Sequence, residues 1–372
     1  MSALIPGLPE DTLAWLRFAN AELTPRAAHA LLDRYGSPAV IFDQDPDELE
    51  DLPELSGEQI ARLLSPERIP TDRQLEAFEQ LQLRLITRDD EDYPPLLRDI
   101  PDRPAYLFVR GELHERDRFA VAIVGTRHPT PYGREIASKL GKDLAELGFT
   151  IVSGGAAGID TAAHQGAFRT GGRTIAVLGC GLDVPYPVHN QQLFREIVEQ
   201  QQGAVLSEYP LGAAPESWRF PVRNRLISGL AMGVVVVEAG SQSGALITAG
   251  TAADQGREVM AVPGNIDRPS SAGTNALIMD GAALVTCAQD VAAHLGVLAH
   301  VRPTEERRST ETLSLPDNQK QVLAKLSLTP KHVDDLTAEL GMNLSEVLSI
   351  LTLLEIRGLV HRQPGATYTR AL

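Results

Sequence analysis

The sequence has few cysteines. Only Cys180 and Cys287 occur among its 372 residues, and their separation matches no disulfide framework, zinc site or redox motif. Cys180 lies between two glycines, but no histidine or other base is placed beside it, which disfavours a cysteine nucleophile. No set of His, Cys, Asp and Glu has metal-ligand spacing. We therefore expect no metal or other cofactor, and a protein suited to a reducing compartment.

Long apolar runs are also missing. The most apolar stretch, Gly229–Val237, is much shorter than the about 20 residues that a membrane-spanning helix requires. The first residues, MSALIPGLPEDTLAW, lack a basic region followed by an apolar core, so they do not resemble a secretory signal. These two absences favour a cytoplasmic protein without a membrane contact.

The sequence has no overall excess of positive charge, which at first argues against nucleic acid as a ligand. The formal net charge is −15. The acidity is concentrated in residues 1–100, which contain 9 Lys and Arg against 21 Asp and Glu. The remaining residues contain 25 Lys and Arg against 28 Asp and Glu, so they are nearly neutral. A local basic pocket therefore remains compatible with the charge distribution.

Two familiar nucleotide-binding motifs are absent. Gly125 and Gly133 have the wrong spacing for a dinucleotide-binding G-x-G-x-x-G, and no Walker-type G-x-x-x-x-G-K-[ST] occurs. Dinucleotide and ATP sites of the usual kind are thereby disfavoured.

Residues 1–80 have the apolar spacing and turn residues of short helices. They indicate a small helical domain similar to SAM or helix-hairpin-helix modules. Because the segment is acidic, we favour a regulatory or protein-contacting role over a grip on the DNA backbone. The helices are expected at Asp11–Asn20, Thr24–Tyr35, Asp45–Leu49, Ser56–Leu64 and Thr71–Gln80.

Residues 81–297 change to an alternation of strands and helices. Two strands, Gln82–Thr87 and Ala105–Arg110, are expected to flank or extend the sheet that follows. Strands without polar alternation, connected by helices, predict a parallel sheet covered on both faces. Right-handed crossovers make this an α/β, Rossmann-like open sheet. The strands are expected at Phe119–Val124, Phe149–Val152, Thr174–Leu178, Ala204–Ser207, Val234–Val237, Val259–Val262 and Ala283–Thr286.

The C-terminal part indicates a linker followed by a small module. Residues 298–314 are polar and unpatterned. Residues 315–372 predict helices at Asn318–Leu326, Lys331–Leu340 and Ser345–Arg357, then a terminal β-hairpin. Three helices and a hairpin are typical of a winged helix.

The turn Ser153–Gly158 follows a predicted buried strand and precedes a helix over Ile159–Arg169. Small residues in such a turn allow an anion to approach the free N–H groups at the helix start. They also allow close packing of the helix on the strand, and the turn alone does not separate these two interpretations.

Two other strand ends add arginines. Arg127 comes directly after a strand, and Arg223 and Arg225 lie two residues apart at an expected helix start. If the three face one crevice, they form a cationic site for phosphates. The structural alternative is that Arg223 or Arg225 pairs with Glu208 or Glu238.

Taken together, these loops resemble the DNA-processing protein A family (DprA, also called Smf). The resemblance covers roughly Phe119–Leu295, and its ordered motifs make it specific. The matching motifs are VAIVGTRHPTPYG (Val121–Gly133), IVSGGAAGIDTAAHQGA (Ile151–Ala167), TIAVLGCGLDVPYP (Thr174–Pro187), LSEYP (Leu206–Pro210), FPVRNRLISGL (Phe220–Leu230), VVVEAGSQSGALITA (Val235–Ala249), VMAVPGN (Val259–Asn265) and SAGTNALIMDGA (Ser271–Ala282).

The resemblance implies a non-enzymatic protein that binds single-stranded DNA, protects incoming strands and loads the RecA recombinase in natural transformation. It also implies a homodimer, for which the apolar segment Ala276-Leu277-Ile278-Met279 is our candidate interface. The resemblance and the loop positions together give the expected DNA-binding residues. They are Gly125, Thr126, Arg127, Tyr132, Ser153, Gly154, Gly155, Gly179, Gly181, His189, Asn190, Phe220, Arg223, Asn224, Arg225, Ser243, Gly244 and Thr248.

The sequence departs from the family's pattern at two loops. The family often has a lysine after Tyr-Pro, whereas Val188 and His189 follow Tyr186-Pro187. Gly155 stands where the family usually has leucine. Aromatic residues in or near the loops offer stacking surfaces for bases. These residues are Tyr132, Tyr186, Tyr209, Trp218 and Phe220.

Two other functions remain as alternatives. A Rossmann-like nucleotide phosphoribohydrolase would share the Gly-Gly turn, but Ser243–Thr248 lacks the carboxylate that its second motif carries. A transcription regulator would read duplex DNA through the winged helix. Because Ser345–Arg357 has few polar groups to read bases, a protein contact or a weak second DNA site at Arg357, His361 and Arg362 is the preferred role of that module.

Overall fold

The computed structural model of the chain describes residues 8–296, 316–327, 331–356, 359–363 and 365–370. These residues form two units, one on each side of residues 297–315. The linker expected at 298–314 lies outside the described residues. Within the described ranges, no helix is long and apolar enough to cross a membrane.

The first unit begins with short α-helices, as the apolar spacing predicts. Ser56 and Thr71 each begin a capping box, with Gln59 and Gln74 at the third helical position. The helix α3 was not expected, because five residues are too few to show a helical period. The helices are α1 (Glu10–Asn20), α2 (Pro25–Tyr35), α3 (Pro38–Phe42), α4 (Pro46–Glu50), α5 (Gly57–Leu64) and α6 (Asp72–Gln80).

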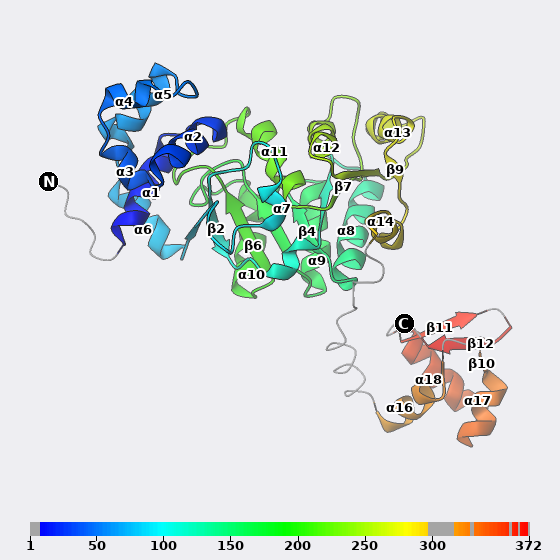
Figure 1. Cartoon of the computed structure of the whole chain (residues 1–372). Coiled ribbons are helices and arrows are strands. Elements are labelled where there is room, and N and C mark those ends of the chain that lie inside the picture. Colours follow the sequence, from blue (N-terminus) through cyan, green and yellow to red (C-terminus); the bar gives the residue numbers. More distant parts are fainter. Residues whose placement is uncertain (1–7, 297–315, 328–330, 357–358, 364, 371–372) are drawn as a thin grey trace. The chain divides into compact units, whose positions relative to one another are not determined.

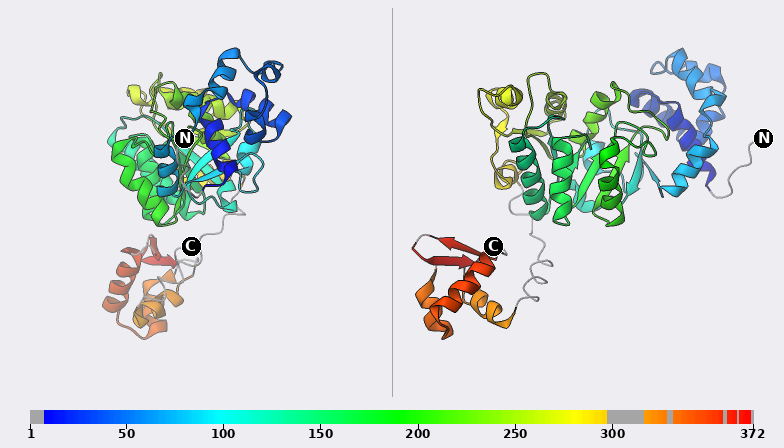
Figure 2. Two further views of the ribbon diagram at one scale, coloured as in Figure 1. Left: turned by 90° about the vertical axis from the view of Figure 1, so that its left-hand side faces the viewer. Right: turned by 180° about the vertical axis from the view of Figure 1, so that it is seen from behind.

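These helices do not stand apart from the sheet. Leu16 of α1 and Phe78 of α6 belong to the same buried cluster as Phe108 and Ala176 of the sheet. The helices gather at the end of the sheet that β2 (Tyr106–Gly111) occupies, as Figures 1 and 2 show. The acidic N-terminal segment is therefore fixed to the sheet by a shared apolar core.

The sheet has the order β1-β2-β6-β5-β4-β3-β7-β8-β9. The strands from β6 to β9 pair in parallel, and β1 and β2 add an antiparallel edge, so the expected α/β fold and the flanking role of the first two strands are both confirmed. The strands are β1 (Arg84–Thr87), β2, β3 (Ala120–Val124), β4 (Thr150–Ser153), β5 (Thr174–Val177), β6 (Gly203–Ser207), β7 (Gly233–Val236), β8 (Glu258–Ala261) and β9 (Ala283–Leu284).

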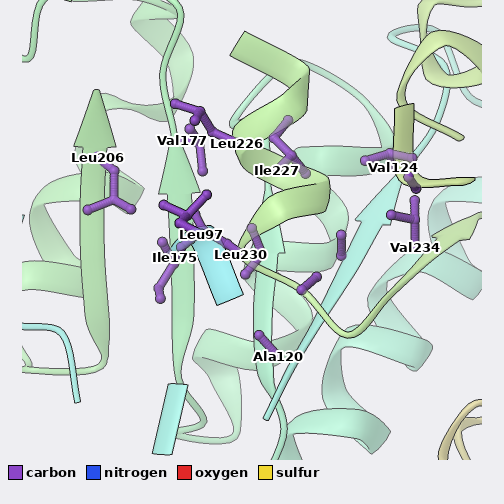
Figure 3. Packing of buried hydrophobic residues seen from close by; sticks show 14 of the residues in the cluster. Leu97, Ala120, Val124, Ile175, Val177, Leu206, Leu226, Ile227, Leu230 and Val234 are labelled. Atoms are coloured by element: carbon purple, nitrogen blue, oxygen red, sulfur yellow. The ribbon is translucent and has the colours of Figure 1, made fainter. Parts of the chain in front are cut away.

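Helices cover both faces of the sheet. On one face lie α8 (Pro131–Glu146), α9 (Ile159–Arg169), α10 (Gln191–Glu199) and α14 (Ala288–His294). On the other lie α7 (Pro95–Arg98), α11 (Arg219–Gly229) and α12 (Gly244–Asp254). Figure 3 shows Leu226, Ile227 and Leu230 of α11 and its C-terminal end beside Ile175 and Val177 of β5. Burial on both faces explains why these strands are continuous apolar runs.

The parallel strands all end at the same edge of the sheet. The chain runs outward in one direction from β3 through β4, β5 and β6, and in the other direction from β7 through β8. The strand order therefore reverses between β3 and β7. In open α/β sheets, a crevice for a ligand forms outside the strand ends at such a point.

The second unit is a winged helix, as predicted. Leu336, Val347, Leu351 and Tyr368 contribute to its apolar core. Arg357, the proposed start of a weak second DNA site, lies outside the described residues. The elements are α16 (Asp317–Ala324), β10 (Lys331–His332), α17 (Val333–Leu340), α18 (Leu344–Ile356), β11 (Val360–Gln363) and β12 (Thr367–Arg370).

Candidate nucleic-acid interface

A cleft of about 470 Å³ opens at the C-terminal edge of the strands. We call it the phosphate cleft, and four segments line it: the loop after β3, the turn before α9, the start of α11 and the start of α12. Half of the residues that we expected to bind DNA line this cleft. These residues are Gly125, Thr126, Arg127, Phe220, Arg223, Asn224, Ser243, Gly244 and Thr248.

The loop after β3 is held by the segment after β7 and by the start of α9. The N–H of Thr126 donates to the Glu238 carbonyl at 2.8 Å, and its carbonyl accepts from Ile159 at 3.2 Å. Gly158 has φ of +89°, and a Cβ there would lie 2.5 Å from the Thr126 carbonyl oxygen. Only glycine permits both this backbone angle and this close approach. The turn before α9 thus fixes the loop that presents Arg127.

Arg127 is exposed at the mouth of the cleft. Its guanidinium carbon lies 5.0 Å from the centre of the Phe220 ring, a distance at which a cation is attracted to an aromatic face. The Phe220 ring in turn packs over Gly179, where a Cβ would approach it to 2.9 Å. Arg127 therefore has a preferred position while its donors remain available to a phosphate.

Arg223 lies deeper and is only 4% exposed. Its Nη1 donates to the carbonyl of Gly154 at 2.8 Å and also to the carbonyl of Val177. Burial lowers the pKa of the guanidinium, and Asp160 opposes that change. A Cβ at Gly154 would lie 2.9 Å from Nη2 and 2.8 Å from Asp160 Oδ2. The small residue at position 154 thus allows a cation and a carboxylate to approach the cleft floor.

Asp160 modifies the expected role of the Ser153–Gly158 turn. Its carboxylate accepts the N–H of Ala156 at 3.3 Å and lies in the first turn of α9. The start of α9 therefore already faces a carboxylate of its own. Burial raises the pKa of Asp160 to about 6, against the opposing effect of Arg223. Only Ala156 of the turn lines the cleft, so the turn contributes shape and support more than free N–H donors.

The start of α12 offers the anion-binding end that α9 lacks. Ser243 caps this helix by accepting the N–H of Ala245 at 3.3 Å. The first turn contains no acidic residue, and Gly244 is exposed beside the cleft. The positive end of the helix therefore adds to the two arginines.

The expectation that Arg225 binds DNA in the cleft is wrong, because Arg225 does not face the cleft. It is buried and pairs with Glu208 at 2.5 Å and with Asp102 at 3.1 Å. The helix α11 begins at Arg219, four residues before the expected start, so Arg223 and Arg225 lie two positions apart within a helix. Residues so spaced point in nearly opposite directions. The structural alternative considered for this pair therefore describes Arg225.

The other expected residues support the cleft or lie outside it. Ser153 is buried and donates to the Ile123 carbonyl at 2.6 Å, and Asn190 is buried and donates to the Gly155 carbonyl at 2.9 Å. His189 is exposed, but the residues that line the cleft do not include it. Tyr132 lines a neighbouring cleft with Glu238 and Arg268. Buried glycines complete this set, namely Gly154, Gly155, Gly179 and Gly181.

The sequence reasoning missed several lining residues, of which Asp160 and His128 carry chemistry. His128 directly follows Arg127, so its position in the same loop was the available signal. Asp160 resembles an ordinary helix-start residue, and its burial at 7% exposure is set by tertiary packing. Burial raises the pKa of Cys180 to about 11, so the thiol remains protonated at neutral pH. The described residues contain no group of His, Cys, Asp and Glu that could hold a metal ion.

Two family models match this chain. The family model described as DNA recombination-mediator protein A matches residues 84–296, and that of the DprA winged helix domain matches residues 305–366. Protein Smf of Escherichia coli K12 is 37% identical over 366 residues, covering 95% of each chain. The DNA processing protein DprA of Bacillus subtilis is 40% identical over 220 residues, covering 59% of this chain and 73% of that protein.

Two solved structures share the fold. DNA processing protein A from Streptococcus pneumoniae superposes with a TM-score of 0.64 at 37% identity, covering 77% of this chain and 96% of that chain. DNA processing protein A from Helicobacter pylori, whose structure is described as showing a single-stranded DNA binding mode, has a TM-score of 0.51 at 33% identity. That match covers 57% of this chain and 95% of that one.

Proposed function

This chain belongs to the DNA recombination-mediator protein A family, and from that premise we propose that its phosphate cleft binds the backbone of single-stranded DNA. In this proposal the protein is a non-enzymatic cytoplasmic mediator that protects incoming strands and loads RecA recombinase during natural transformation. One observation carries the cleft assignment: accessible Arg127, buried Arg223 and the acid-free start of α12 line the same cavity.

The geometry suits a polymer backbone better than a compact nucleotide. Arg127 lies at the mouth with its donors open, whereas Arg223 is held on the floor by carbonyl oxygens. Two cations at different depths can each neutralise a phosphate of a continuous strand. Phe220 adds an aromatic surface beside them, which is the second element of single-strand binders.

A salt titration with and without Arg127 tests the proposal. With two phosphate contacts, log affinity for single strands should fall by about 1.4 per log unit of salt. Arg127→Ala should weaken binding and reduce that slope by about 0.7. Arg169→Ala is the matched control, because Arg169 is an exposed arginine at the far end of α9. Equal affinity of the Arg127→Ala variant and wild type for single strands would refute the cleft assignment.

Two further parts of the proposal have separate tests. RecA assembly on single-stranded DNA should be faster with the wild-type protein than with Arg127→Ala. A homodimer through the segment Ala276, Leu277, Ile278 and Met279 is supported by the 87% exposure of Met279. If light scattering showed a monomer at micromolar concentration, the proposed homodimer would be refuted.

One observation favours the alternative function of a nucleotide phosphoribohydrolase. Asp160 is a buried carboxylate in the cleft with a pKa raised to about 6, which is a property of many catalytic acids. A nucleotide phosphoribohydrolase would release free base from nucleoside monophosphates, and Asp160→Asn would abolish the release. Absence of base release by the wild-type protein eliminates this alternative.

A further inference from the structure

A second cavity lies where the N-terminal helices meet the sheet. It has a volume of about 230 Å³, and residues from both parts of the unit line it, including Leu23, Pro25, Tyr209, Trp218 and Val222. We call it the Trp218 groove. Its walls are mostly apolar or aromatic side chains, so it suits a flat, uncharged group.

The carboxylates beside the groove are already paired. Glu22 lies 2.6 Å from Arg219 Nη1 and 4.0 Å from Arg68. Glu208 lies 2.5 Å from Arg225. Because these charges are compensated within the protein, they attract neither a cation nor an anion strongly. A phosphate is therefore a poor occupant of the groove, and an uncharged ring is a good one.

Trp218 presents a fixed aromatic surface in this groove. The Arg219 guanidinium lies 4.7 Å from the indole centre and 4.6 Å from the Tyr209 ring centre. The indole N–H donates to Glu216. Although these contacts hold one side of the ring, Trp218 remains 53% exposed. An indole that is held in place and accessible is a ready stacking surface for a base.

One short segment connects the groove with the phosphate cleft. Ser217, Phe220 and Pro221 line the cleft, whereas Trp218 and Val222 line the groove. The cleft and the groove therefore share the chain segment 217–222. We propose that the Trp218 groove accepts an unstacked base of the single strand, with the base lying against the indole. The inference rests on the proposed function, since it requires the backbone to lie in the cleft.

The two tryptophans of the sequence permit a direct test. Trp15 is 7% exposed and Trp218 is 53% exposed, and no other tryptophan occurs. In a Trp15→Phe protein, emission therefore reports on Trp218 alone. A thymidine oligonucleotide should quench this emission on binding. An abasic oligonucleotide of the same length, which keeps the phosphates, should bind without quenching it.

Substitution of Trp218 gives an independent readout. Trp218→Ala should weaken binding of the thymidine oligonucleotide about tenfold and leave binding of the abasic oligonucleotide unchanged. Trp218→Phe should restore most of the loss, because phenylalanine keeps a stacking face. A misfolded variant would bind both oligonucleotides more weakly. The affinity for the abasic oligonucleotide therefore distinguishes a loss of base stacking from a loss of folded structure.

The outcomes distinguish this inference from the proposed function. If both oligonucleotides bound without quenching, or with equal quenching, the groove would not be a base site. The assignment of the phosphate cleft would be unaffected. A concentration-dependent shift of Trp218 emission without DNA would assign the groove to a second copy of the chain instead. Failure of both oligonucleotides to bind would refute the phosphate cleft and the groove together.

Discussion

The guanidinium of Arg127 lies over the ring of Phe220, with 5.0 Å between the guanidinium carbon and the ring centre. The two residues come from segments 93 positions apart, and Gly179 leaves space for the ring beneath them. An exposed arginine ordinarily samples many rotamers, and the cost of ordering it reduces its affinity for a phosphate. The ring restricts the arginine before a ligand arrives, so less of that cost remains to be met on binding.

The first prediction concerns this ring. Phe220→Ala should weaken single-strand binding about two- to fivefold, from loss of the cation–π contact that holds Arg127. Phe220→Tyr keeps the ring and should bind like wild type. Fluorescence anisotropy with a labelled oligonucleotide measures both variants. Tighter binding by the alanine variant would mean that the ring obstructs the cleft.

The second prediction separates stability from binding at Arg225. Arg225→Ala leaves the buried Glu208 carboxylate without its closest cation, so the free energy of unfolding should fall by about 3 kcal/mol. Affinity for single strands, measured where the variant is folded, should not change, because Arg225 lies outside the cleft. Chemical denaturation at neutral pH measures the stability.

A double variant provides the control for this loss. Arg225→Met combined with Glu208→Gln removes both charges together and should recover much of the stability. If the Arg225→Ala variant kept wild-type stability and lost affinity for DNA, Arg225 would be a DNA-binding residue after all.

The third prediction is a pH dependence of binding that arises from Asp160. Burial raises the pKa of this carboxyl to about 6, so it is mostly ionised at pH 7 and takes up a proton as the pH falls through that value. Loss of a negative charge beside Arg223 favours an anionic strand. Affinity should therefore rise on acidification from neutral pH, and Asp160→Asn should remove that rise.

His128 lines the same cleft as Asp160. The comparison is therefore made in a His128→Asn background, with oligonucleotide titrations between pH 5 and pH 7.5. An identical pH dependence with and without the Asp160→Asn substitution would assign the effect to another group.

The fourth prediction concerns acid stability at His164. This side chain is fully buried, its Nδ1 lies 2.6 Å from Thr174 Oγ1, and burial lowers its pKa to about 3. Below the ordinary histidine pKa of about 6.5, the unfolded chain binds a proton that the folded protein does not. The free energy of unfolding should therefore fall on acidification, by at most about 1.4 kcal/mol per pH unit.

Asp160 acts in the opposite direction on stability. Its raised pKa means that the folded protein binds a proton near pH 6, whereas the unfolded chain does so near about pH 4. Stability from this group rises as the pH falls between these values, which offsets the loss at His164. Asp160→Asn should therefore make the protein more acid-sensitive, and His164→Gln should make it less so. Urea denaturation from pH 4 to pH 7 measures both, and parallel pH profiles for the two variants would contradict the assignment.

Much of the α/β unit could be predicted because its signals are local. The helix Ile159–Arg169 has the bounds that the small-residue turn and the apolar spacing predict. Ile175–Val177 is a continuous apolar run in β5 that is buried on both faces, and β5 is a parallel strand for that reason. The start of α11 was placed four residues late, because Trp218 to Val222 contains a proline and no apolar period. Proline is tolerated in the first turn of a helix, so it did not mark a boundary.

The membership of the cleft was predictable only in part. Parallel strands bring their C-terminal ends to one edge, so Arg127, Arg223 and Ser243 were expected near each other from chain order and the family resemblance. Which side chain of a helix faces that edge depends on how the helix packs on the sheet, and residues two positions apart in a helix point in nearly opposite directions. Arg225 was misplaced for this reason. The pairing of Glu22 with Arg219 joins residues 197 positions apart, and no local pattern indicates it.

By itself, the sequence determined the α/β class, the winged helix, the family and the loops that meet at the strand ends. These follow from periodicity, turn chemistry and motif order, all of which act over a few residues. Only the tertiary structure decided that Arg223 lines the cleft while Arg225 pairs with Glu208, that Asp160 is buried, and that the N-terminal helices form one wall of the Trp218 groove. Those outcomes depend on which distant surfaces exclude water together, because desolvation and charge pairing are set by packing across the whole unit.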